Sequence, residues 1–179
     1  MTALDAELPA APDYADAFVA WRVWRVVASR EGYRLASVVK STLWPPGAPL
    51  AAECLRSPLG TFFRRRRAKA HAAPDAGCEC GIYAGRLAAI GEYLTEPPAA
   101  AVTRVLGQVS LWGTVIECER GFRASQAYPA RLYVPVEPAL AAEHRWDSLL
   151  GALEVYGVPV ELLEARPSEA IRALRQTHV

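Results

Sequence analysis

Three of the four cysteines and one of the three histidines lie between residues 54 and 80. Sixteen residues separate Cys54 from His71, six separate His71 from Cys78, and one separates Cys78 from Cys80. Thiolate sulfur and imidazole nitrogen are donors that zinc accepts in tetrahedral protein sites. A glycine near each side of the Cys-Glu-Cys segment permits the tight turn that brings two sulfurs to one centre. The sequence therefore predicts a structural zinc site with Cys54, His71, Cys78 and Cys80 as ligands.

Other chemistry stays open for these residues. The thiols could be small buried side chains beside a surface histidine, or Cys78 and Cys80 could be a redox pair, although a disulfide between such near neighbours is strained. An iron–sulfur cluster would need Cys118 in place of His71, but Cys118 is more simply a core or inter-strand thiol. Four protein ligands leave zinc no open position for water, so a catalytic site returns only if Glu79 replaces one of them.

Two further groups of side chains are candidates for contact with a ligand or partner. A dense run of arginines predicts a solvated loop, or a contact with a phosphate, a nucleic acid or an acidic partner. Aromatic residues around an arginine on a predicted hairpin could line a groove for a planar ligand, a nucleotide or a peptide. The alternative is an ordinary sheet core in which that arginine pairs with Glu117 or Glu119. The two groups comprise Arg64, Arg65, Arg66, Arg67, Trp112, Phe122, Arg123 and Tyr128.

Standard catalytic signatures are missing from the sequence. It contains no Gly-x-Ser-x-Gly elbow, phosphate-binding loop, dinucleotide-binding glycine motif, His-Glu-x-x-His pair or zinc deaminase pattern. No residue is therefore predicted to be catalytic, and an enzyme is the less favoured class.

Composition and charge narrow the class of protein. A net charge of +1 over 179 residues argues against a protein that coats nucleic acid by bulk charge. A chain of this length can bury a core without help from a metal. The unevenly clustered cysteines, the absence of a secretory signal pattern and the absence of a long apolar run predict a cytoplasmic protein with reduced or metal-bound thiols.

The sequence patterns of the segments around these side chains predict an α+β fold. Residues 1–17 are acidic and rich in Ala and Pro, which predicts a disordered tail, and residues 18–179 are expected to form a single domain. β-Branched and aromatic residues predict strands, and apolar periodicity with proline or glycine at the ends predicts helices. Strands are expected over 18–28, 33–39, 102–118, 122–127, 131–136 and 158–163, and helices over 49–55, 82–94, 138–155 and 167–176.

The long strand pattern after residue 102 indicates a bent sheet. Gly107 and Gly113 interrupt it, which is typical of bulges or sharp bends, and Tyr128-Pro129 is expected to break the return strand. Neither face of the first strand is purely polar, so cover on both sides is expected there at least in part. The predicted fold is a bent antiparallel sheet or partial β-barrel, covered on one side by two or three helices, with a zinc-type loop.

Several segments carry a resemblance to a known family. They are residues 21–25, Trp44-Pro45, Cys54, residues 71–74, the segment Cys78-Glu-Cys-Gly-Ile-Tyr-Ala, and the hairpin from Trp112-Gly to Tyr128-Pro129. Over residues 18–165 the chain resembles an uncharacterised family of small bacterial proteins. That family has no known activity, so the resemblance implies no catalytic residue.

The leading interpretation is a cytoplasmic binding or adaptor protein with a structural zinc site and an aromatic-plus-basic interaction surface. Its expected partner is a protein, and no membrane association is expected. One alternative is a nucleic-acid-associated regulatory module that uses Arg64–Arg67. The other is a small-molecule enzyme with an open metal site.

Overall fold

The computed structural model describes residues 17–40, 42–54, 71–95, 104–136 and 145–177. The predicted tail and the arginine run Arg64–Arg67 lie outside these residues. The described strands are β1 (Phe18–Ser29), β2 (Gly32–Ser37), β3 (Leu50–Ala51), β4 (Ile82–Gly85), β5 (Arg104–Cys118), β6 (Gly121–Pro135) and β7 (Val160–Leu163). The described helices are α1 (Glu92–Thr95), α3 (Arg145–Leu153) and α4 (Ala170–Thr177), with 3-10 turns η2 (Leu87–Ala89) and η3 (Glu154–Tyr156).

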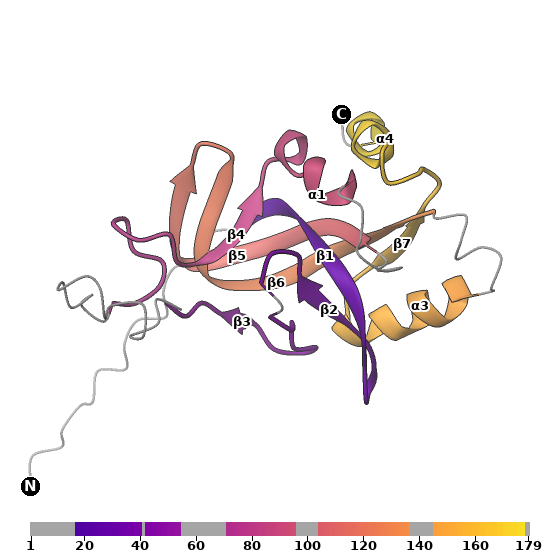
Figure 1. Cartoon of the computed structure of the whole chain (residues 1–179), viewed down its shortest axis with the longest axis horizontal. Helices are drawn as coiled ribbons and strands as arrows, with labels where there is room; N and C mark the ends of the chain where they lie inside the picture. The colour runs from indigo at the N-terminus through magenta and orange to yellow at the C-terminus, as the bar shows by residue number, and fades with distance from the viewer. Residues whose placement is uncertain (1–16, 41, 55–70, 96–103, 137–144, 178–179) are drawn as a thin grey trace, which may run out of the picture.

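The described strands form one strongly bent mixed sheet, which Figure 1 shows from its broad side. The long hairpin of β5 and β6 is its centre, and β1 runs antiparallel to β5. Strand β4 pairs along β6 but reaches β1 through the single pair Trp21 and Gly85, so the sheet bends without closing into a barrel. Strand β7 lies parallel to β6, so the prediction of a purely antiparallel sheet is wrong at this edge.

The predicted irregularities of the long hairpin are confirmed. The register between β5 and β6 shifts between Gln108 and Val109, and again between Trp112 and Val115, next to the two interrupting glycines. The predicted break at Tyr128-Pro129 is wrong, because β6 continues through it. Pro129 lies opposite Val109, at the first register shift, where a residue without an N–H group is tolerated.

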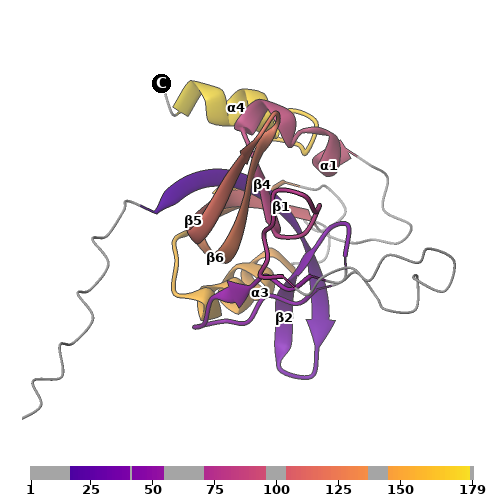
Figure 2. The same ribbon diagram turned by 90° about the vertical axis from the view of Figure 1, so that its left-hand side faces the viewer.

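Adjacent residues of the central strands point into two different cores. Val23 packs with residues of α1 and α4, namely Leu94, Ala170 and Leu174. Its neighbour Trp24 packs with Leu149 and Leu153 of α3. Figures 1 and 2 show α1 and α4 together on one side of the sheet and α3 on the other. Cover on both faces of β1 is therefore confirmed, and the prediction that the helices cover one side is wrong.

Strands replace one predicted helix and the first part of another. Residues 49–55 were expected to be helical, but Leu50 and Ala51 form β3, which pairs with β6. Residues 82–94 begin with strand β4. Ile82 and Ala84 are buried while Tyr83 between them is exposed, which is the alternation of a strand with one buried face. Three consecutive apolar residues conceal this alternation in the sequence. Helical turns begin only at η2.

The C-terminal elements follow the prediction closely. Strand β7 and helix α4 are confirmed, and α3 with η3 covers the described part of the helix expected over 138–155. Residues 137–144 lie outside the described part. No helix among the described residues is both long enough and apolar enough to cross a membrane.

Candidate metal centre

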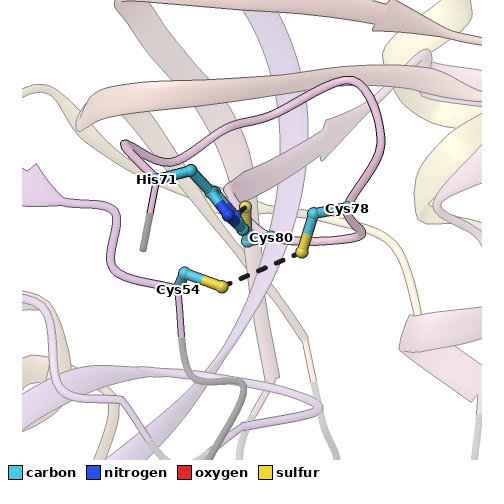
Figure 3. A group of neighbouring side chains, drawn as sticks. All are labelled: Cys54, His71, Cys78 and Cys80. Carbon is cyan, nitrogen blue, oxygen red and sulfur yellow. Dashed lines mark hydrogen bonds between the residues drawn. The ribbon is translucent and has the colours of Figure 1, made fainter. Parts of the chain in front are cut away.

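The four residues predicted as zinc ligands lie together in the structure. One donor atom from each of Cys54, His71, Cys78 and Cys80 lies within 4.8 Å of all the others. The Cys54 and Cys78 sulfurs are 3.8 Å apart, and His71 Nε2 is 3.3 Å from the Cys80 sulfur. Figure 3 shows the four side chains converging from two segments of the chain. The grouping that the sequence predicted is confirmed, and these residues could hold a metal ion.

The separations agree with tetrahedral coordination. Two thiolates about 2.3 Å from one zinc ion would lie about 3.8 Å apart, and a sulfur and an imidazole nitrogen would lie about 3.5 Å apart. The Cys54–Cys78 and His71–Cys80 separations are close to these values. The four donors therefore lie close enough together to hold a metal ion.

Strand β6 anchors two of the segments that carry these residues. Cys54 follows β3, and the extended chain between them adds a hydrogen bond from the Ala52 N–H to the Ser125 carbonyl, 2.8 Å. Cys80 precedes β4, whose first residue, Ile82, pairs with Ala124 of β6. Ala124 and Ser125, adjacent residues of β6, thus hold the chain near Cys54 and the chain after Cys80 side by side.

The loop before β4, residues 71–81 (the metal loop), is held by short turns. The Asp75 carboxylate accepts a hydrogen bond of 2.8 Å from the Gly77 N–H, and its carbonyl accepts one of 3.1 Å from the Cys78 N–H. Gly81 has a φ angle of +123°, and a Cβ there would lie 3.0 Å from Pro74 Cβ and 3.2 Å from Arg123 Cβ. Only glycine allows the loop to pass this point without displacing its neighbours.

Arg123 clamps the loop from the sheet. Its side chain is buried and donates hydrogen bonds to the carbonyls of Cys78 and of Cys80, the latter at 3.1 Å. Its Nε lies 3.4 Å from the sulfur of Cys118. This hydrogen bond raises the pKa of Arg123 above its usual value although burial opposes the shift, so the guanidinium stays charged. A fixed positive charge beside the loop favours thiolates over thiols.

The thiols of Cys78 and Cys80 titrate as a pair with opposite shifts. Burial tends to raise the pKa of Cys78, but hydrogen bonds from Cys80, Cys54 and His71 outweigh burial and lower that pKa to about 7. Burial and the neighbouring Cys78 raise the pKa of Cys80. The first proton therefore leaves at Cys78. Thiolates are the form that binds metal, so Cys78 is the thiol of this pair that is more readily available to a cation near neutral pH.

Cys118 and Glu79 stay outside the group of donors. All four cysteines are free thiols, and Cys118 lies against Arg123 and the Ile116 carbonyl, in agreement with the preference for an inter-strand thiol. The Glu79 side chain is exposed and is not one of the four clustered residues. Its backbone carbonyl accepts a hydrogen bond of 2.7 Å from the Tyr83 hydroxyl.

The residues of the aromatic hairpin take separate structural places. Phe122 packs on Phe18 with ring centroids 5.9 Å apart, and the Tyr128 hydroxyl joins the Gly47 N–H to the Tyr156 carbonyl. Trp112 is half-buried opposite Gln126. Arg123 turns away to the metal loop. The alternative in which it pairs with Glu117 or Glu119 is wrong, because Arg123 forms no ion pair with a described residue, and Glu117 pairs with Arg86 at 2.5 Å. The clamp by Arg123 was missed, and no local sequence pattern indicates it.

The fold and the site together define a sheet-rich α+β protein with a Cys/His group that could hold a metal ion. No protein-family model, curated protein or solved structure matches the chain.

Proposed function

We propose that the chain is a cytoplasmic binding protein in which Cys54, His71, Cys78 and Cys80 hold one structural zinc ion. The observation that supports this most directly is that three sulfurs and one nitrogen lie within 4.8 Å of one another, with two of the separations close to those of a zinc tetrahedron. Such a set suits zinc better than magnesium or calcium, which prefer oxygen ligands.

A structural role is favoured over a catalytic one by the number of ligands. Four protein donors fill the tetrahedron of zinc, so no position remains for water or substrate. Cys54 and His71 are also the residues on either side of the stretch 55–70. Zinc bound to both would close this stretch into a loop, and a cross-link across about 15 residues removes about 3 kcal/mol of entropy from the unfolded chain.

The loop closed in this way carries Arg64–Arg67, and we propose that these residues bind an acidic surface of a protein partner. Support comes from the sequence: the run is the densest charge of a chain whose net charge is only +1. A partner that recognises one basic loop agrees with this better than bulk binding of nucleic acid. A nucleic-acid partner is the competing outcome, and its binding would weaken steeply with salt.

Metal content tests the zinc proposal. Protein expressed in zinc-replete medium and purified without chelator should carry one zinc ion per chain, measured by native mass spectrometry and elemental analysis. Cys54→Ser and Cys80→Ser should lower the zinc content and the melting temperature. Cys118→Ser is the matched control, because Cys118 lies outside the donor group, and it should keep the zinc. Wild-type protein with well under one metal ion per chain would overturn the proposal.

Capture experiments test the partner. Zinc-loaded wild type and a variant with Arg64–Arg67 changed to Gln would be used as bait in lysate treated with nuclease. A bound protein that survives nuclease, and is lost with the variant, supports the proposed surface. Binding that nuclease abolishes would assign the loop to nucleic acid instead. Equal capture by both baits would show that the loop is not the contact.

A further inference from the structure

A cleft of about 850 Å³ opens where the sheet is interrupted along one edge of β1. On this edge β1 pairs with β4 only at Trp21 and with β2 only from Trp24 onward. Arg22 and Val23 between them have no strand partner on that edge within the described chain. The end of β2, the strand β4 and the metal loop form the walls of the opening.

The walls of the cleft are mainly apolar, and its volume suits a small molecule. Binding sites for small ligands typically measure about 300–1,000 Å³ and combine apolar walls with a few polar groups that orient the ligand. The apolar side chains that line this cleft include Val23, Val38, Ile82, Ile90 and Phe122. A ligand here would bury an apolar body.

Arg22 places a positive charge at this cleft. Its guanidinium donates to the Tyr83 carbonyl and, at 3.0 Å, to the Ser37 hydroxyl, and it lies 5.0 Å from the centre of the Trp44 ring. None of these neighbours carries a negative charge. Arginine has five N–H donors, and the described chain accepts hydrogen bonds from two of them; the enclosed Nε has no acceptor.

The charge of Arg22 is not compensated within the described chain. Burial lowers the pKa of Arg22 to about 10, and a smaller effect of Tyr93 opposes this shift. The side chain is therefore still a cation at neutral pH, but burial disfavours its charged form. A desolvated cation is costly unless an anion pairs with it. The other charged residues at the cleft differ: Arg120 is paired with Glu92 at 2.7 Å, and Lys40, Glu53 and Glu79 are exposed. The thiolates of Cys54, Cys78 and Cys80 also line the cleft, and zinc in the proposed metal site would take up their charge.

We propose that this cleft binds a small apolar carboxylate, with the carboxylate on Arg22 and the apolar body against the walls. A guanidinium matches a carboxylate with two parallel N–H donors, and one cation balances one monoanion, whereas a phosphate dianion would leave excess negative charge in an apolar cleft. The proposal goes beyond the structural zinc ion and the protein partner, although Cys78–Gly81 of the metal loop form part of the wall.

A pair of probes that differ in charge tests the proposal on the unmodified protein. 2-Naphthoate and 2-naphthamide would be titrated into the full chain by calorimetry, with the zinc content of the same sample measured. Naphthoate should bind about tenfold or more tightly than naphthamide, because a charged hydrogen bond is lost with the amide. Nuclear Overhauser contacts from the naphthyl ring should reach the methyl groups of Val38, Ile82 and Ile90.

Variants then assign the preference to one residue. Arg22→Gln should abolish the difference between the two probes, whereas Arg131→Gln, with the same charge change at a surface ion pair away from the cleft, should retain it. Equal affinities of wild type for both probes, no naphthoate binding at millimolar concentration, or ring contacts elsewhere would overturn the proposal. Because the probe comparison needs no variant, it decides the matter even if Arg22→Gln fails to fold. If the protein carries zinc but does not prefer naphthoate over naphthamide, the carboxylate proposal is refuted and the zinc proposal stands.

Discussion

Replacing Arg123 by methionine removes the clamp between the sheet and the metal loop. Methionine keeps much of the length and apolar contact of the arginine stem but has no donor. The residue is 8% exposed, so water cannot easily take over its hydrogen bonds. The carbonyls of Cys78 and Cys80 would lose a charged donor, and the Cys118 sulfur would lose its contact with Nε.

The cost follows from these contacts. Hydrogen bonds from a charged group contribute about 1.5–3 kcal/mol each, so the two carbonyl contacts together predict a loss of about 3–6 kcal/mol in the free energy of unfolding. The loop carries three of the four metal donors, His71, Cys78 and Cys80. Residues that orient metal ligands typically change metal affinity about 10- to 100-fold, and we expect a loss of zinc affinity in that range.

Two measurements separate the effects on stability and on metal binding. Zinc affinity would be measured by competition with the chromophoric chelator 4-(2-pyridylazo)resorcinol, and stability by urea unfolding of the zinc-loaded and stripped forms. Arg131→Met is the control, because its surface ion pair with Glu161 should contribute less than about 1 kcal/mol. Arg123→Lys should recover part of the affinity, since one ammonium cannot reproduce the fork of a guanidinium. If Arg123→Met binds zinc as tightly as wild type, the clamp does not position the ligands.

Three further changes test other parts of the structure. The Tyr156 hydroxyl bridges the Leu35 N–H and the Trp44 carbonyl, and Tyr156→Phe leaves both buried groups without this partner. Urea unfolding should show a loss of about 1–3 kcal/mol in the free energy of unfolding, and no loss would mean that water replaces the hydroxyl. In the zinc-stripped chain, iodoacetamide should modify Cys78 before Cys80 near neutral pH, with a rate that rises as pH passes about 7; peptide mass spectrometry that finds Cys80 first would contradict the pKa order. Gly121→Ala places a Cβ 2.1 Å from a backbone oxygen of β4 and should lower the melting temperature by several degrees. Gly151→Ala in α3 has open space around the new Cβ and should raise the free energy of unfolding by about 0.5–1 kcal/mol. Equal effects of the two changes would contradict the packing.

The metal group could be predicted because its signal is local and chemical. Soft donors are rare in this chain, and three thiols with one imidazole within one short stretch point to a shared ligand even when the path of the chain is unknown. The same reasoning separated Cys118 from the group, since its strand pattern indicated an inter-strand position. The identity of the metal does not follow from geometry alone and stays a proposal.

The strands with β-branched and aromatic residues could also be predicted, but which strands pair and which face each helix covers could not. The parallel position of β7 and the split of the helices between two faces depend on pairings between distant residues. Strand β4 was misread because Ile82, Tyr83 and Ala84 are all apolar, and only burial reveals that they alternate. Periodicity cannot separate a short buried strand from one helical turn under these conditions.

The role of Arg123 depends on register rather than composition, and it links metal binding to the sheet. Arg123 lies 43 residues from Cys80, and it reaches the metal loop because β6 pairs with β4 as far as Ala124 and Ile82. The same strand holds β3, which leads to Cys54. A shift of one residue in the β4–β6 register would turn Arg123 and its neighbours to the opposite face. Zinc bound to Cys54 and Cys80 would therefore stabilise the correct register of β6 against both flanking strands, so loss of zinc should loosen β3 and β4 before it affects the core beneath α3.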